Sequence, residues 1–223
     1  MCGRFTLTVD LPTILRLFQA KYQGEGFEFS KRYNIAPGQD IPVITSTNSK
    51  REILLMRWGL IPPWAKNATI GYKMINARAE TIDQRPAFKQ SFLLRRCLIP
   101  TDGFYEWKKQ DGQKTPIWIT LPSKEVFAFA GIYARWSSPE GIEIRSFSII
   151  TTGANNTVRM IHDRMPVILA GESDYRTWLE QAETSARLKQ LLHPYRGQMA
   201  MHKVSSLINS PKFDHSAAIN EIK

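Results

Sequence analysis

The sequence predicts one α+β domain built around mostly antiparallel strands. Segments rich in Ile, Val, Phe, Trp and Thr recur along the 223 residues, without the regularly spaced helices that a parallel sheet requires. The sequence contains no internal repeat, no low-complexity segment and no linker richer in turn residues than the hairpin-sized stretch at 137–141. We therefore expect a single domain over residues 1–208, followed by a polar and loose C-terminal tail over residues 209–223.

The first third of the chain predicts one short helix and a pair of strands. Asp10 suits an N-cap, and the apolar spacing that starts at Leu11 predicts an amphipathic helix to about Tyr22, ended by Gly24 and Gly26. The prolines at 62 and 63 argue against a central strand there. Expected further elements are a turn-rich loop over 32–38, paired strands over 41–45 and 52–58, and a rigid aromatic surface loop over 58–64.

Residues 81–204 contain most of the predicted strands and two helical patterns. A helical pattern covers 81–94, with an interruption at Pro86, and a second amphipathic helix should begin at a Ser173 N-cap and break near Thr184. Its inward side chains would be Trp178, Leu179, Leu188, Leu191 and Leu192. Strands are expected over 97–100, 116–121, 126–136, 142–152, 166–169 and 200–204.

Composition narrows the function classes. Thirty Lys and Arg against 20 Asp and Glu give a formal charge of +10, which favours a polyanionic partner such as nucleic acid without identifying one. The sequence has no apolar run of signal-peptide or membrane-span length, so we expect a cytoplasmic protein without a membrane partner. Cys2, Cys97 and four histidines match neither a disulfide framework nor a zinc spacing, so we predict no metal and no cofactor.

The N-terminus carries the first candidate reactive group. Removal of Met1 would leave Cys2 with an amine and a thiol on adjacent carbons. Such a 1,2-aminothiol traps aldehydes, because the amine forms an imine and the thiol then closes a five-membered thiazolidine. Considered alone, Cys2 is better interpreted as part of a frayed chain end with an incidental thiol.

Two further clusters place reactive side chains next to apolar segments. In 76–80, the amide oxygen of Asn76 could orient a terminal amine, and Arg78 would lie on the same strand face to bind a phosphate. In 102–107, the aromatic neighbours of Glu106 would raise the pKa of its carboxyl and suit it to proton transfer. A turn asparagine, a surface arginine and a solvated glutamate paired with a lysine are the competing interpretations.

A third cluster covers residues 161–166. His162, beside Asp163 and Arg164, could be an acid or base tuned by its neighbours, or it could cap the end of a helix. No single cluster decides the function.

Taken together, the motifs resemble the SRAP family, the SOS-response-associated peptidase-like proteins that crosslink to abasic DNA. The resemblance covers about Cys2 to Val204 and implies a barrel-like sheet core with a few flanking helices. It is carried by MCGRF at the start, YNIAPG at 33–38, WGLIPPW at 58–64, NARAET at 76–81, DGFYEW at 102–107 and IHDRMPVIL at 161–169.

The resemblance also implies roles for individual residues. Cys2 would be the nucleophile, and Asn76 would hold its amine. Glu106 would act as general acid and base, and His162 would assist the imine steps. The loop at Trp64 has one tryptophan where some relatives carry two. The residues implied to contact DNA are Arg4, Pro37, Trp64, Arg78, Trp107, Thr151 and Arg164.

The resulting hypothesis is a sensor and shield of abasic sites in single-stranded DNA, with lyase and self-processing peptidase activities as further expectations. An α-amine titrates near 7.7 to 8.0 and a lysine near 10.4, so roughly 300-fold more of the α-amine is neutral at pH 7. The resemblance implies a monomer that joins the nucleoid when bound to DNA. The alternatives are an N-terminal-nucleophile cysteine hydrolase and a non-enzymatic basic nucleic-acid-binding module.

Overall fold

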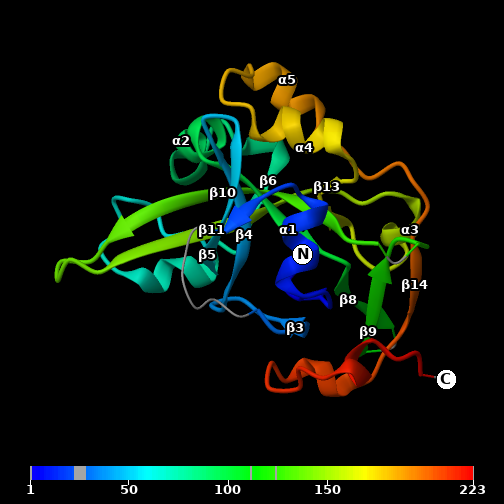
Figure 1. Ribbon diagram of the computed structural model, residues 1–223. Helices are drawn as coiled ribbons and strands as arrows, with labels where there is room; N and C mark the ends of the chain where they lie inside the picture. The colour runs from blue at the N-terminus through cyan, green and yellow to red at the C-terminus, as the bar shows by residue number, and fades with distance from the viewer. Residues whose placement is uncertain (1, 23–28, 111, 124, 223) are drawn as a thin grey trace.

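A five-stranded barrel forms the core of the computed structural model, which describes residues 2–22, 29–110, 112–123 and 125–222 (Figure 1). Neighbouring barrel strands are antiparallel, except that β5 and β11 pair in parallel and close the ring. The predicted α+β class and barrel-like core are confirmed. In ring order the strands are β4 (Asp40–Thr47), β5 (Lys50–Trp58), β11 (Glu143–Gly153), β10 (Phe127–Ser137) and β7 (Arg96–Thr101).

A second, five-stranded antiparallel sheet packs beside the barrel and contains the start of the chain. The sequence predicted only two of its strands, β9 and β14, and the expected loop over 32–38 is wrong for residues 32–35, which form β3. In order the strands are β14 (Ala200–Lys203), β9 (Gln113–Thr120), β8 (Gly103–Gln110), β1 (Phe5–Leu7) and β3 (Arg32–Ile35).

Short strands and helices surround the barrel, and the last two 3-10 helices of the chain lie against the second sheet (Figure 1). None of the helices described is long and apolar enough to cross a membrane. The short strands are β2 (Lys21–Tyr22), β6 (Asn76–Arg78), β12 (Arg164–Pro166) and β13 (Ile168–Leu169). The α-helices are α1 (Leu11–Leu17), α2 (Pro86–Leu94), α3 (Asn156–Arg159), α4 (Glu172–Leu179) and α5 (Ser185–Gln190). The 3-10 helices are η1 (Ala68–Lys73), η2 (Ala79–Thr81), η3 (Ser206–Asn209) and η4 (Ser216–Ile219).

Phe5 anchors the start of the chain in the core. Its ring is fully buried and packs edge-on against Trp58 at 5.1 Å and against Phe129 at 5.8 Å between ring centroids. Burial of a phenylalanine stabilises a fold by about 1.5–3 kcal/mol, and such aromatic pairs add to it. Cys2, three residues earlier, is also fully buried, so its interpretation as part of a frayed end is wrong.

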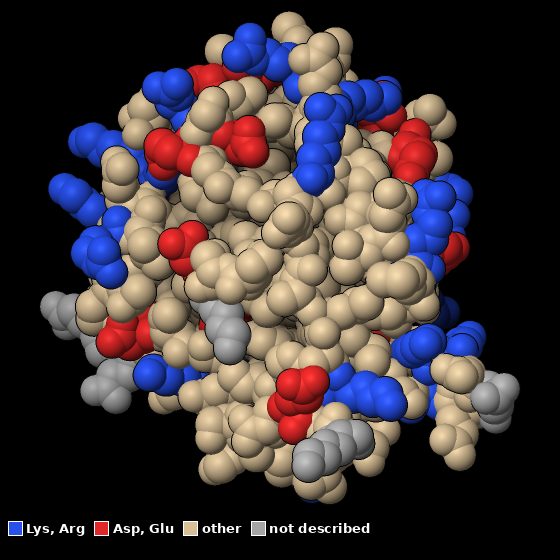
Figure 2. Space-filling model, turned by 90° about the vertical axis from the view of Figure 1, so that its right-hand side faces the viewer, with Lys and Arg blue, Asp and Glu red and all other residues tan. Residues whose placement is uncertain are grey.

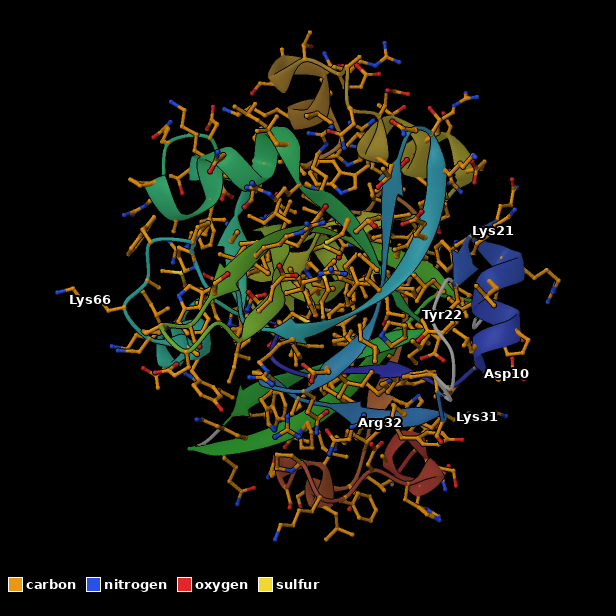
Figure 3. All side chains as sticks on the ribbon, turned by 60° about the vertical axis from the view of Figure 1, so that its left-hand side comes forward. Asp10, Lys21, Tyr22, Lys31, Arg32 and Lys66 are labelled. Atoms are coloured by element: carbon orange, nitrogen blue, oxygen red, sulfur yellow. The ribbon has the colours of Figure 1, made fainter. Side chains whose placement is uncertain are left out.

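The first helix is shorter than predicted. Asp10 caps α1 as expected, accepting a hydrogen bond from the Thr13 N–H at 3.0 Å. The helix ends at Leu17 because Gln19 adopts a positive φ of 49° and residues 21–22 then pair with β5. Figure 3 shows Asp10 at one end of α1 and Lys21 near the other. The glycines at 24 and 26 lie outside the described residues.

The later helices also depart from the prediction at their ends. Pro86 begins α2 instead of interrupting a helix, as its fixed φ allows in a first turn. The N-cap of α4 is Gly171 and not Ser173, whereas the break near Thr184 is confirmed because Thr184 caps α5. Trp178 and Leu188 are fully buried, as expected.

The 58–64 segment is mostly core. Trp58, Leu60 and Ile61 are at most 1% exposed, and only the exposed Pro63 and Trp64, the latter 61% exposed, fit the expected surface loop. Gly59 explains this path: its φ is +120°, and an added Cβ would lie 2.6 Å from the Gly71 carbonyl oxygen. The backbone of 58–61 therefore follows the core before it reaches the surface.

The C-terminal segment is fixed to β3 and is not a loose tail. The Asp214 carboxylate pairs with Arg32 and accepts hydrogen bonds from the N–H groups of Tyr33 and Asn34. The buried Asn34 amide donates to the carbonyls of Ile208, Ser210 and Phe213, at 2.8–3.1 Å. Figure 3 shows Arg32 where β3 meets this segment.

Candidate active site

Cys2 lies just before β1, an inner strand of the second sheet that pairs with β8. The Tyr105 N–H donates to the Arg4 carbonyl at 3.0 Å, and the Cys2 Sγ lies 3.8 Å from the same oxygen. Burial raises the pKa of the Cys2 thiol far above its usual value, and the charge of Glu106 raises it further. The thiol is therefore neutral at physiological pH and must lose its proton during a reaction.

Asn76 holds the backbone of Cys2. Its Nδ2 donates to the Cys2 carbonyl at 2.8 Å, across the gap between β6 and the start of the chain. Its Oδ1 is buried and has no hydrogen-bond partner in the described part of the chain. A buried amide oxygen without a partner is costly, so it marks a place where a donor belongs.

Glu106 lies in β8, where the strand is still buried, and is 2% exposed. Burial raises the pKa of its carboxyl to about 7. The sequence-based expectation of a raised pKa is thus confirmed, although the cause is burial in the sheet and not only its aromatic neighbours. A carboxyl with this pKa exchanges protons readily near neutral pH.

His162 follows α3 and shares a pocket with Glu106. Partial burial lowers the pKa of its imidazole, which favours the neutral ring. In that state Nδ1 accepts the N–H of Arg164 at 2.9 Å, and the ring proton is on Nε2. A protonated Nδ1 would instead donate a hydrogen bond to the Asp163 Oδ1, which lies 2.8 Å away.

Three residues predicted to contact DNA meet along β11. Thr151 pairs in register with Arg78 on one side, and the neighbouring strand β12 begins at Arg164 on the other. The Arg164 guanidinium donates to the Thr151 carbonyl at 2.7 Å. Arg78 is exposed, whereas the Arg164 side chain is only 15% exposed and pairs with both carboxylate oxygens of Glu80.

Arg4 and Trp107 meet at Asn209. Arg4 donates to the carbonyls of Ile208 and Asn209 and to the Asn34 Oδ1, at 2.5–3.1 Å. The Trp107 Nε1 donates to the Asn209 Oδ1 at 2.8 Å. In the described part of the chain, no carboxylate lies within ion-pair distance of Arg4, so its charge is offset only by neutral oxygens.

The pocket beside these groups has a volume of about 460 Å³, within the range of ligand sites. The face over β9, β14 and α3 has a mostly uncharged centre, with Lys and Arg side chains mainly toward its edges (Figure 2). No cluster of His, Cys, Asp and Glu that could hold a metal occurs in the ranges described. The pocket is lined by Glu106, Trp107, Lys109, Lys114, His162 and Asn209.

Pro37 and Trp64 lie outside this pocket. Pro37 occupies the turn between β3 and β4, one residue before Gly38 donates to the Trp58 carbonyl. Trp64 lines a separate cleft of about 300 Å³ at the start of α2. The structure therefore gathers Cys2, Asn76, Glu106 and His162, while these two residues would meet only a longer ligand.

Sequence reasoning gave no site role to Asn209 and Glu80, nor to the pocket residues Lys109 and Lys114. Asn209 was assigned to the tail, and Glu80 was noticed only as part of the Asn76 cluster. Both are exposed polar residues whose partners are distant in sequence, so no local pattern marks them.

Comparison with known proteins identifies the family of the chain. Residues 1–211 match the family described as SOS response associated peptidase. The chain is 47% identical over 216 residues to the abasic site processing protein YoqW of Bacillus subtilis, across 95% of this chain and 96% of that protein. It is 32% identical over 221 residues to the abasic site processing protein HMCES of Xenopus tropicalis, across 85% and 65%.

Solved structures show the same fold. The structure of a protein from Bacteroides thetaiotaomicron matches with a TM-score of 0.91 and 27% identity, over the full length of both chains. A second, from Bordetella bronchiseptica, matches with a TM-score of 0.75 and 25% identity, across 92% of this chain and 100% of that one. The resemblance of the ordered motifs is thus confirmed, and the chain belongs to the SOS response associated peptidase (SRAP) family.

Proposed function

We propose that this protein processes abasic sites in single-stranded DNA by forming a thiazolidine crosslink through Cys2 once Met1 is removed. The observation that carries the proposal is the position of the Asn76 side chain beside Cys2. Its Nδ2 donates to the Cys2 carbonyl, and its Oδ1 is buried without a hydrogen-bond partner among the described residues. Relatives named for abasic site processing support the substrate class.

The reaction needs a neutral amine and a movable proton. Glu106 would take the proton of the C1′ hydroxyl and return it to the ring oxygen O4′ as the C1′–O4′ bond breaks and the deoxyribose opens to its aldehyde. The Cys2 amine, held by Asn76 Oδ1, would add to C1′, and water would leave to give an imine. The thiol sulfur would then add to C1′ while its proton passes to Glu106 or to the imine nitrogen, which completes the thiazolidine.

The high pKa of the thiol sets the order of these steps. A neutral, buried thiol is a weak nucleophile at first encounter, so the amine reacts first. Once the imine forms, sulfur and carbon are in one molecule, where effective molarities reach about 10⁵ M or more. The same high pKa disfavours the alternative cysteine hydrolase, whose thiol must attack an amide directly.

A lyase reaction would compete at the imine stage. If the thiol does not close, Glu106 or His162 could remove a proton from C2′, and the C3′–O bond to the 3′ phosphate would break. If the protein cleaves the bond between Met1 and Cys2 itself, that cleavage would be the peptidase activity that the family name describes. Both activities would depend on the residues already gathered around Cys2.

The test is adduct formation by protein with Met1 removed. Incubated with a single-stranded oligonucleotide bearing one abasic site, it should form a denaturation-resistant adduct whose mass is the sum of both minus one water. Cys2→Ala should abolish the adduct, whereas Cys97→Ala, which removes the other buried cysteine, should retain it. Amide hydrolysis without an adduct would support the hydrolase, and reversible binding alone would support a non-enzymatic module.

A further inference from the structure

The β8–β9 hairpin carries a cluster of lysines beside the site. β8 is buried as far as Glu106 and exposed from Lys108 to its end, so the hairpin extends beyond the sheet. Lys108, Lys109 and Lys114 lie on this extension. In the part of the chain described, none of them has a carboxylate within ion-pair distance.

Lys109 and Lys114 face each other directly. They form a cross-strand pair in the β8–β9 ladder, and Trp107, two residues earlier, shares their face. Like charges placed opposite each other destabilise a sheet. An anion bound between the two ammonium groups would remove that repulsion.

The two lysines lie in the same pocket as two of the reactive groups. Both lysines line the pocket that contains Glu106 and His162. Asn209 lines it too: its Oδ1 accepts from Trp107, which leaves its Nδ2 as a donor with no acceptor among the described residues. Glu106 is the acidic group of the pocket, and it lies on the buried part of β8, before the exposed tip.

We propose that Lys109 and Lys114 form a phosphate-binding subsite that holds a phosphodiester of the bound single strand beside the abasic sugar. The Asn209 amide would donate to the same phosphate, and Trp107 would offer its ring to the adjoining base. This inference rests on the proposed function and extends it, because it adds the hairpin to the predicted DNA contacts of Arg4, Arg78 and Arg164.

The experiment measures how salt weakens binding of an oligonucleotide with a tetrahydrofuran in place of the abasic sugar, which cannot form an imine. Neutralising one phosphate of a single strand contributes about 0.7 to the slope of log K against log salt concentration. The double variant Lys109→Gln/Lys114→Gln should lower the slope by about 0.7 between 50 and 200 mM salt, because one phosphate is no longer neutralised. Lys109→Arg/Lys114→Arg should keep the wild-type slope.

The control variant is Lys21→Gln/Lys50→Gln, which removes the same charge from a different pocket beside α4. It should leave the slope unchanged. An unaltered slope in the hairpin variant, an equal fall in the control, or a fall in the arginine variant would each overturn the subsite. Absence of any adduct with true abasic DNA would refute the crosslinking chemistry instead, because the tetrahydrofuran measurement does not depend on it.

Discussion

Both carboxylate oxygens of Glu80 accept hydrogen bonds from the Arg164 guanidinium, at 2.5 and 3.0 Å. The Glu80 side chain is 51% exposed, whereas that of Arg164 is 15% exposed. The carboxylate therefore covers the accessible side of a guanidinium whose other hydrogen bonds go to Thr151. A DNA phosphate that binds Arg164 must share this position or displace Glu80.

Glu80→Gln should therefore strengthen binding of single-stranded DNA. An amide competes weakly for the guanidinium, so affinity should rise about 5-fold, equivalent to about 1 kcal/mol, the upper end for an exposed ion pair. The salt slope should steepen by about 0.7. Glu143→Gln removes the same charge from an exposed pair with Arg145 and should change neither quantity. Weaker binding by Glu80→Gln would mean that Glu80 positions Arg164 and does not compete for it.

Asn76→Ala should slow crosslinking without weakening binding. Loss of the hydrogen bond to the Cys2 carbonyl frees the start of the chain, and small misplacements of reacting groups cost up to about 100-fold in rate. The rate constant for adduct formation should fall at least about 10-fold, while affinity for the tetrahydrofuran oligonucleotide stays within about 2-fold. Asn220→Ala, at an exposed position, is the control. An unchanged rate would refute the role of Asn76.

Asp214→Ala should destabilise the whole fold. It leaves Arg32 unpaired and removes the acceptor of two backbone N–H groups in β3. Hydrogen bonds to charged groups contribute about 1.5–3 kcal/mol, so the free energy of unfolding should fall by about 2–3 kcal/mol in urea titrations. Lys212→Ala, on the exposed surface of the same segment, should stay within about 0.5 kcal/mol. Equal stabilities would mean that the segment is only loosely attached.

The barrel could be predicted from the sequence because its strands are long and rich in β-branched and aromatic residues. β10 and β11 have 11 residues each, and their predicted ranges differ from the observed ones by one residue at each end. β1 has three residues, too few for a period-2 pattern. The attachment of the tail was unpredictable because Asp214 binds backbone groups about 180 residues earlier, which no local pattern records.

The reactive groups could be selected from ordered motifs, but their relation to one another required the fold. Nothing in the sequence near Asn76 says that its amide reaches the Cys2 carbonyl, 74 residues earlier. Glu80 and Asn209 were missed for the same reason, since each acquires its role from a distant arginine. All the predicted roles in DNA binding, those of Arg4, Pro37, Trp64, Arg78, Trp107, Thr151 and Arg164, stay predictions.

Glu106→Gln should alter the pH dependence of stability in a defined direction. The carboxyl has a pKa of about 7 in the folded protein and a model value of 4.5. The folded state therefore binds more protons than the unfolded state between these values, so the free energy of unfolding falls as pH rises through that window. Below about pH 4.5 the burial penalty is absent, and above about pH 7 it reaches about 3 kcal/mol.

Glutamine cannot ionise and escapes this penalty. The stability of Glu106→Gln relative to wild type should therefore increase by up to about 3 kcal/mol between pH 4.5 and pH 8 in urea titrations. Glu125→Gln, which alters an exposed carboxyl in the turn before β10, should show no such increase. If the difference between Glu106→Gln and wild type were the same at both pH values, the carboxyl would titrate alike in both states. It would then lack the proton affinity that the proposed ring opening requires.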